Sequence, residues 1–158
     1  MQLLATVAAT ATASLVIAPS AVANRMDTAD AIPWPRAATS SCRSMFERMK
    51  NYPNGYWQPL VENRPLSRVA VLRREWLIIH QDGLRAIRAQ APARTRLQVN
   101  AVGEYVHMLD TIRRVARTAE TGDRRAYNVA NVQMALAILK TRRAFARAGA
   151  GHICDFGI

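Results

Sequence analysis

Few of the residues and motifs on which enzyme active sites are built occur in this chain of 158 residues. It has three histidines, His80, His107 and His152, and it contains no H-E-x-x-H, no G-x-S-x-G and no glycine-rich phosphate loop. Those motifs supply the metal ligands, the nucleophile and the phosphate-binding backbone of common enzyme classes. The sequence therefore predicts a protein that is not an enzyme and that uses no metal or cofactor.

One pair of side chains resembles half of a di-iron site. Glu104 and His107 form an E-x-x-H pair, which places a carboxylate and an imidazole one helical turn apart. A di-iron bundle needs a second E-x-x-H and two further glutamates, and the sequence lacks them. Asp110 follows three residues later, so a charged, solvated helix face accounts for all three residues more simply.

Lysine is almost absent, since Lys50 and Lys140 are the only two, and arginine therefore carries the formal net charge of +11. Arginine forks bind phosphate and carboxylate groups well. Two causes of the basic excess that involve no anionic partner stay open. A GC-rich genome encodes arginine at many solvated positions, and cations near a helix C-terminus complement the helix dipole.

Arginines that are candidates for anion binding lie in three groups along the chain. The groups are Arg68, Arg73 and Arg74; Arg113, Arg114 and Arg117; and Arg142, Arg143 and Arg147. We predict that these faces bind an anionic lipid, a wall polymer or an acidic protein. No specific nucleic-acid partner is expected, because no nucleic-acid reading motif is present.

The first residues are typical of a signal peptide. The chain from Leu3 to Ala18 is uncharged and mostly apolar, Pro19 follows, and residues 21–23 have the small-x-small pattern that signal peptidase accepts. We expect cleavage near Ala23 and a secreted, periplasmic or cell-envelope location. Met1 and Gln2 carry no positive side chain, so a start further upstream and an uncleaved anchor both remain alternatives.

Residues 24–41 are predicted to form a flexible, proline-containing linker, because they are polar and include Pro33-Trp34-Pro35. Residues 42–158 are predicted to form one helical domain. Its first helix is short, capped by Ser40 or Ser41 and ending near Lys50, with Met45, Phe46 and Met49 on one side.

Three longer segments follow, each of about 25 residues with apolar side chains every three or four positions. They run from about Pro65 to Ala91, from Pro92 to the turn at residues 121–123, and from Asp123 to about Ala148. Since the connections are short, neighbouring helices should be antiparallel. The predicted fold is all-α: an up-and-down bundle of three long helices plus a short N-terminal helix, closed by one disulfide.

The predicted core is an apolar stripe on each long helix. On the third, Tyr127, Met134, Ile138, Phe145 and Ala148 share one face, and Val132, Leu136 and Leu139 are expected beside it. Asn131 lies on the same face and is expected to be a buried polar residue that specifies helix register.

The chain has just two cysteines, Cys42 before the long helices and Cys154 after them. In an exported protein this layout predicts one structural disulfide. A metal site that combines Cys154 with His152, or a reactive thiol pair, are the alternatives. The disulfide makes a geometric demand, because an odd number of long helices leaves Cys154 at the far end unless the chain before Pro65 returns along the bundle.

His80 lies on the apolar stripe of the first long helix, between Leu77 and Leu84. The default interpretation is a core or boundary histidine with one hydrogen bond. The functional alternative makes it an axial haem ligand, with Tyr105 or Met108 as a partner on the next helix. This leaves a second candidate function, a carrier of a small apolar ligand such as haem.

The layout resembles that of small exported actinobacterial helical proteins, in which a signal peptide is followed by a cysteine, a few helices and a second cysteine near the end. The matching features are Cys42 and the tail from Gly149 to Cys154. The mycobacterial haemophore-related proteins share this outline. The resemblance implies export and a helical fold, and no haem-contacting motif of that family is matched residue by residue.

Overall fold

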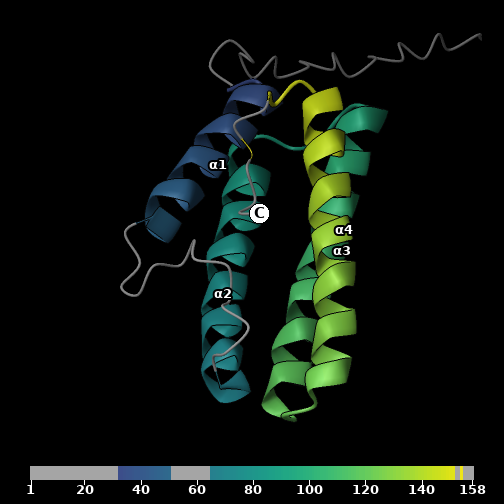
Figure 1. Cartoon of the computed structure of the whole chain (residues 1–158). Helices are drawn as coiled ribbons and strands as arrows, with labels where there is room; N and C mark the ends of the chain where they lie inside the picture. Colours follow the sequence, from purple (N-terminus) through teal and green to yellow (C-terminus); the bar gives the residue numbers. More distant parts are fainter. Residues whose placement is uncertain (1–31, 51–64, 152–153, 155–158) are drawn as a thin grey trace, which may run out of the picture.

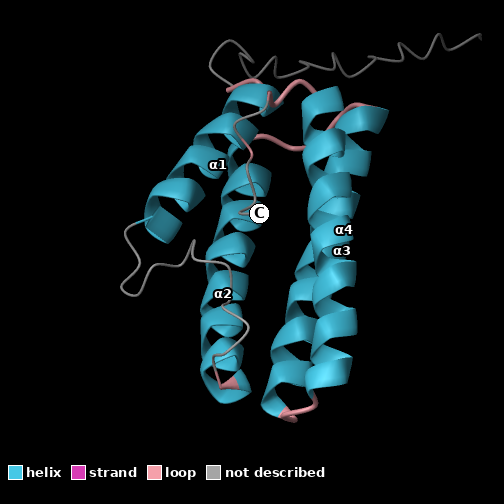
Figure 2. Ribbon diagram, in the orientation of Figure 1, coloured by secondary structure: helices cyan, strands magenta, loops and turns pink. Residues whose placement is uncertain are grey.

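The computed structural model describes residues 32–50, 65–151 and 154, and nearly all of these residues are in four helices. The helices are α1 (Trp34–Lys50), α2 (Leu66–Gln90), α3 (Arg96–Glu120) and α4 (Arg124–Arg147). Each helix packs against the next one in the sequence, and no strand occurs in the described part of the chain (Figure 2). The predicted all-α class is confirmed.

The N-terminal helix differs from the prediction. It begins at Trp34, so residues 34–41 belong to a helix of 17 residues and not to the predicted linker. The carbonyl oxygen of Pro33 accepts hydrogen bonds from the backbone N–H groups of Arg36 and Ala37. Pro35 lies in the first turn, where its missing N–H costs nothing. The Pro-Trp-Pro sequence is therefore a helix start.

The start of α3 also differs, whereas the start of α4 is as predicted. Pro92 does not open α3, because Thr95 caps this helix and forms a reciprocal capping box with Gln98. Before α4, Gly122 has a φ of 74°, and the Asp123 side chain accepts a hydrogen bond from the N–H of Ala126. The turn at residues 121–123 was correctly placed.

A row of rings runs through the core and joins all four helices. The ring centroids of Trp76 and His80 on α2 are 5.1 Å apart, and His80 lies 6.0 Å from Tyr105 on α3. Tyr105 lies 5.5 Å from Phe145 on α4, which lies 5.5 Å from Trp34 on α1. All five side chains are buried. Trp34 thus docks on the bundle and is part of its core.

The outer side of α4 contradicts one part of the predicted core. The expected face of Tyr127, Met134, Ile138, Phe145 and Ala148 is buried. Val132, Leu136 and Leu139, expected beside that face, are instead 61%, 55% and 40% exposed. These three side chains point away from the buried face of α4 and towards solvent.

The two cysteines are joined in a disulfide, with a Cα–Cα distance of 5.0 Å. After α4, Gly149 and Gly151 adopt positive φ values of 89° and 69°, and the chain turns back towards α1. The Thr39 hydroxyl donates a hydrogen bond to the carbonyl oxygen of Ala150. In Figure 1 the start of α1 lies at the same end of the molecule as the end of α4. The helix α1 thus satisfies the geometric demand of the disulfide.

None of the helices in the described part of the chain is both long and apolar enough to cross a membrane. The predicted signal peptide at residues 1–23 lies outside the described residues, as do residues 24–31 of the predicted linker.

The contact between α1 and α2 at Gly83 gives a first testable prediction. A methyl group added at Gly83 would overlap the sulfur of Met45 and lie 2.7 Å from its Cγ. We expect Gly83→Ala to lower the free energy of unfolding by about 1 to 3 kcal/mol, because the overlap outweighs the gain in helix propensity. Urea denaturation measures the change.

The matched control is Gly103→Ala on α3, where an added methyl group meets no atom within 4 Å. It should stabilise the protein by up to about 1 kcal/mol. If Gly83→Ala stabilised the protein as much as Gly103→Ala, that result would contradict the close packing of Met45 against Gly83 on α2.

Candidate functional site

The candidate ligand His80 lies at the centre of a buried polar cluster. Its side chain is 0% exposed, and its Nδ1 lies 3.1 Å from the Tyr105 hydroxyl oxygen. That hydroxyl also lies 2.9 Å from the Met45 sulfur and 3.1 Å from the His80 carbonyl oxygen, both of which are acceptors for its proton. The cluster ties α1, α2 and α3 together.

Burial determines the protonation state of this cluster. It lowers the pKa of His80 from 6.5 to about 3, because a charged imidazole would lose its hydration. Burial also raises the pKa of Tyr105 well above its usual value. At neutral pH both side chains are therefore uncharged, which is the state that a dry core tolerates.

The cluster matches the default interpretation of His80 as a core histidine. The possible partners in haem ligation, Tyr105 and Met108, are also 0% exposed. Coordination of iron by His80 would require the core to open between α2 and α3. A haem-carrier function stays a prediction, which titration of the protein with haemin and of a His80→Ala variant tests.

The E-x-x-H pair behaves as a surface feature. Glu104 is half-buried, His107 is exposed, and Asp110 forms an ion pair with Arg113. Within residues 32–50, 65–151 and 154, no group of three histidine, cysteine or acidic side chains is placed to hold a metal ion. Cys154 is committed to its disulfide, and His152 lies outside the described residues.

About half of the candidate arginines already have a partner within the protein. Arg74 forms an ion pair with Glu120 at 2.9 Å, and Arg113 pairs with Asp110. The half-buried Arg73 donates a hydrogen bond to Asn131 and lies over the Trp76 ring, with its guanidinium carbon 4.8 Å from the ring centroid. Arg114 donates a hydrogen bond to Gln133. These contacts give their arginines a structural role.

Other candidate arginines face solvent. Arg68, Arg117, Arg143 and Arg147 are exposed, and none of them forms an ion pair within the described residues. Arg143 and Arg147 belong to α4, which has six basic residues and no acidic residue over its 24 positions. The structure therefore distributes the nine candidates over three helices, and α4 is the most basic of them.

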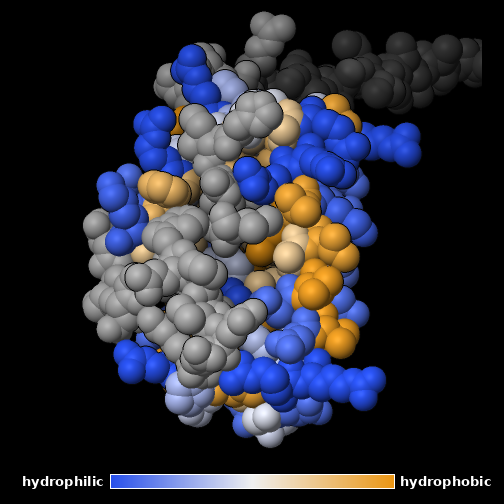
Figure 3. Space-filling view, in the orientation of Figure 1, coloured by the Kyte–Doolittle hydropathy of each residue, from blue (hydrophilic) through white to orange (hydrophobic). Residues whose placement is uncertain are grey.

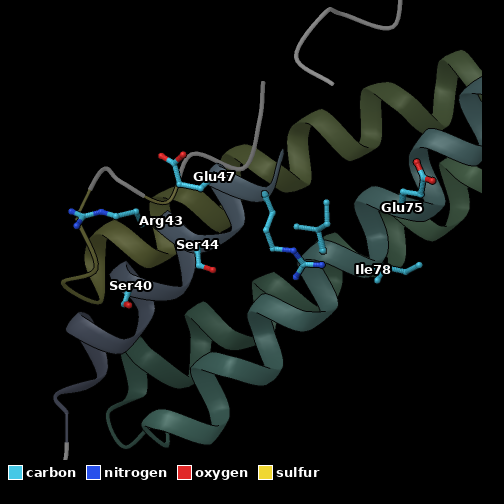
Figure 4. A pocket seen from close by; sticks show the side chains of 8 residues that line it. Ser40, Arg43, Ser44, Glu47, Glu75 and Ile78 are labelled. Atoms are coloured by element: carbon cyan, nitrogen blue, oxygen red, sulfur yellow. The ribbon is translucent and has the colours of Figure 1, made fainter. Parts of the chain in front are cut away.

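The sequence interpretation missed an open groove between α1 and α2. Its volume is about 840 Å³, and Figure 4 shows side chains of both helices around it. The lining residues are Ser40, Arg43, Ser44, Glu47, Arg48, Glu75, Ile78 and Ile79. Arg48 is held by an ion pair with Asp82 at 3.0 Å. Charges of both signs line the groove, so it has no preference for an anion.

The second missed feature is the exposed apolar stripe on the outer side of α4. It consists of Val129, Val132, Leu136 and Leu139, and Figure 3 shows hydrophobic residues gathered along the edge where Figure 1 places this helix. The sequence contains the signal, because α4 has apolar residues on two opposite sides and only one of these sides can face the other helices.

Comparison with known proteins identifies no relative. No protein-family model matches the chain, and no curated protein and no solved structure matches it.

Proposed function

We propose that this protein is an exported, non-enzymatic binding protein that attaches to an anionic surface or partner through its arginine-rich faces. The observation that carries the proposal is the composition of α4, whose six cationic side chains are accompanied by no acidic one. A helix of one charge sign attracts counter-charges from solution. The exposed arginines that have no ion pair within the described residues supply forks for phosphate or carboxylate groups.

The proposal includes three expectations from the sequence. Export depends on the signal peptide at residues 1–23, with cleavage near Ala23. The helices form an up-and-down bundle, which is a rigid scaffold for a surface-binding face. The anionic target is a lipid, a wall polymer or an acidic protein. The disulfide supports an oxidising compartment, where such bonds form and persist.

Salt-dependent retention on a heparin matrix tests the proposal. We expect binding to weaken by at least about tenfold when the ionic strength rises from about 0.1 to 0.5 M, because exposed charges are screened. The variant Arg143→Gln/Arg147→Gln should elute at clearly lower salt than the wild type.

The control variant is Arg48→Gln/Arg113→Gln, which changes the net charge by the same amount but removes arginines already paired with Asp82 and Asp110. It should elute from the heparin matrix at higher salt than the α4 variant. Equal elution of the two variants would mean that net charge alone, and not a particular arginine face, determines binding.

A further inference from the structure

The apolar stripe of α4 is narrow and continuous. At about 100° per residue, its four side chains fall within roughly 80° of the helix circumference and extend over about 15 Å of the axis. Val129, Val132, Leu136 and Leu139 are 56%, 61%, 55% and 40% exposed. The buried face of α4, with Tyr127, lies on the opposite side. Four branched aliphatic side chains in one line form an apolar surface that nothing in the described chain covers.

Arginines bound the stripe at both of its ends. Arg125 and Arg143 are 18 residues apart, which is five helical turns, so both lie on the line of the stripe. Both are exposed, and neither forms an ion pair within the described residues. Figure 3 shows hydrophilic residues above and below the hydrophobic edge. A partner of this surface must be apolar in the middle and negative around it.

A second copy of the chain does not satisfy this requirement. The stripe is symmetric about Met134, so antiparallel contact between two α4 helices would place Val132 opposite Leu136. The same contact would place Arg125 opposite the Arg143 of the other copy. Parallel contact would place each of these arginines opposite the same arginine of the other copy. Like charges in an apolar contact are destabilising, so the charge pattern opposes self-association.

A specific protein partner fits less well than a lipid surface. Stable protein interfaces are built around buried aromatic or arginine anchors in pockets, and this stripe has no aromatic side chain. A hollow of about 340 Å³ reaches Val129 and Arg125 at one end of the stripe, and Val132, Leu136 and Leu139 do not line it. A basic amphipathic helix with aliphatic residues on its apolar face is instead suited to the boundary between lipid headgroups and acyl chains. Arginine at both ends pairs with lipid phosphates.

We propose that α4 lies along the surface of an anionic lipid bilayer, with Val129, Val132, Leu136 and Leu139 inserted among the acyl chains and Arg125 and Arg143 bound to headgroup phosphates. This inference deepens the proposed function, on which it rests, by naming its partner and binding face. It requires no membrane-spanning segment, because the helix stays parallel to the surface.

Sedimentation with lipid vesicles tests the inference, using the full exported chain with its disulfide intact. The vesicles contain equal parts of phosphatidylglycerol and phosphatidylcholine, and pure phosphatidylcholine is the neutral comparison. The test variant is Val132→Ser/Leu136→Ser, which removes apolar surface and leaves the charge unchanged. We expect its partition onto the anionic vesicles to fall by about tenfold.

The matched control is Val71→Ser/Ile78→Ser on α2, which removes two side chains of similar exposure, 51% and 53%. It should partition like the wild type. Because all four replaced residues are exposed, both variants should keep the helical circular dichroism of the wild type, and both should elute with it from the heparin matrix.

The outcomes separate the two proposals. Loss of vesicle binding in the α4 variant alone supports insertion of the stripe. Equal vesicle binding by the wild type and both variants would overturn the inference and leave the proposed function intact, as would heparin binding without vesicle binding. A wild type that sediments as a dimer, while Val132→Ser/Leu136→Ser is monomeric, would show that a second copy covers the stripe. Failure to bind either anionic target contradicts the proposed function itself.

Discussion

Replacing both Cys42 and Cys154 by alanine is expected to lower the free energy of unfolding by about 4 to 5 kcal/mol. The bond joins residues 112 positions apart, so in the chain-entropy model its loss frees nearly the whole helical domain in the unfolded state. Both residues are buried, and alanine avoids placing an unpaired hydroxyl group at either position. Urea denaturation of the variant and the wild type measures the difference.

Reduction of the wild type provides an independent comparison. A reductant should lower the urea midpoint of unfolding of the wild type but not that of the double alanine variant. If the reduced wild type were as stable as the oxidised one, the bond would not restrain the fold. A variant that changes Cys42 alone should release one free thiol to Ellman's reagent after denaturation, whereas the wild type should release none.

The second large effect is a loss of stability in mild acid that depends on His80. The folded protein keeps this imidazole neutral down to about pH 3, whereas the unfolded chain takes up a proton as the pH falls below about 6.5. The unfolded state therefore binds more protons throughout this window, and stability falls as the pH falls. Between pH 7 and 4.5 we expect a loss of about 2 to 3 kcal/mol.

Two comparisons assign this loss to His80. Hydrogen bonds from Arg85 and Arg48 lower the pKa of Asp82, so its stabilising contribution is lost only at more acidic pH, below the usual carboxyl value of 3.8. His80→Gln should flatten the stability profile between pH 7 and 4.5. His107→Gln, which changes an exposed histidine on α3, should show the same loss of stability with falling pH as the wild type. A flat profile in the wild type would mean that water reaches His80.

The helical class could be predicted because it depends on local signals, and the disulfide because the chain has two cysteines. Apolar residues at helical spacing specify the faces that carry Tyr105 and Phe145, and Gly122 and Asp123 mark the end of one helix and the start of the next. Two cysteines on either side of the long helices allow a single intramolecular pairing. The helix inferences need only residues that are close together in the sequence. The disulfide inference needs only the number of cysteines.

The features that were missed depend on packing. Whether Pro33-Trp34-Pro35 opens a helix or forms an arm depends on whether Trp34 finds a site against Phe145, more than a hundred residues away. Apolar side chains on two sides of α4 look alike in sequence, and only the position of α3 decides which side the described chain buries. For the same reason the sequence pattern wrongly predicted Val132, Leu136 and Leu139 to lie in the core.

The sequence identified the candidate arginines but could not show which of them are bound within the protein and which face solvent. Arg74 and Arg113 are engaged by acidic side chains, Glu120 on a neighbouring helix and Asp110 one turn away, while Arg143 and Arg147 face solvent. Partners on the same helix follow from spacing, but partners on a neighbouring helix require the crossing geometry. The distinction between structural and available arginines is therefore a result of the fold.

The disulfide also determines how the protein responds to proteolysis. Cys42 lies within α1 and Cys154 lies beyond α4, so every peptide bond between them belongs to one covalent ring. A single cut anywhere in that ring, including the connection between Lys50 and Pro65, leaves two pieces that are still one molecule. Helix α1 then stays next to its site on the bundle at a high effective concentration. Separation of the pieces requires both a cut and a reductant.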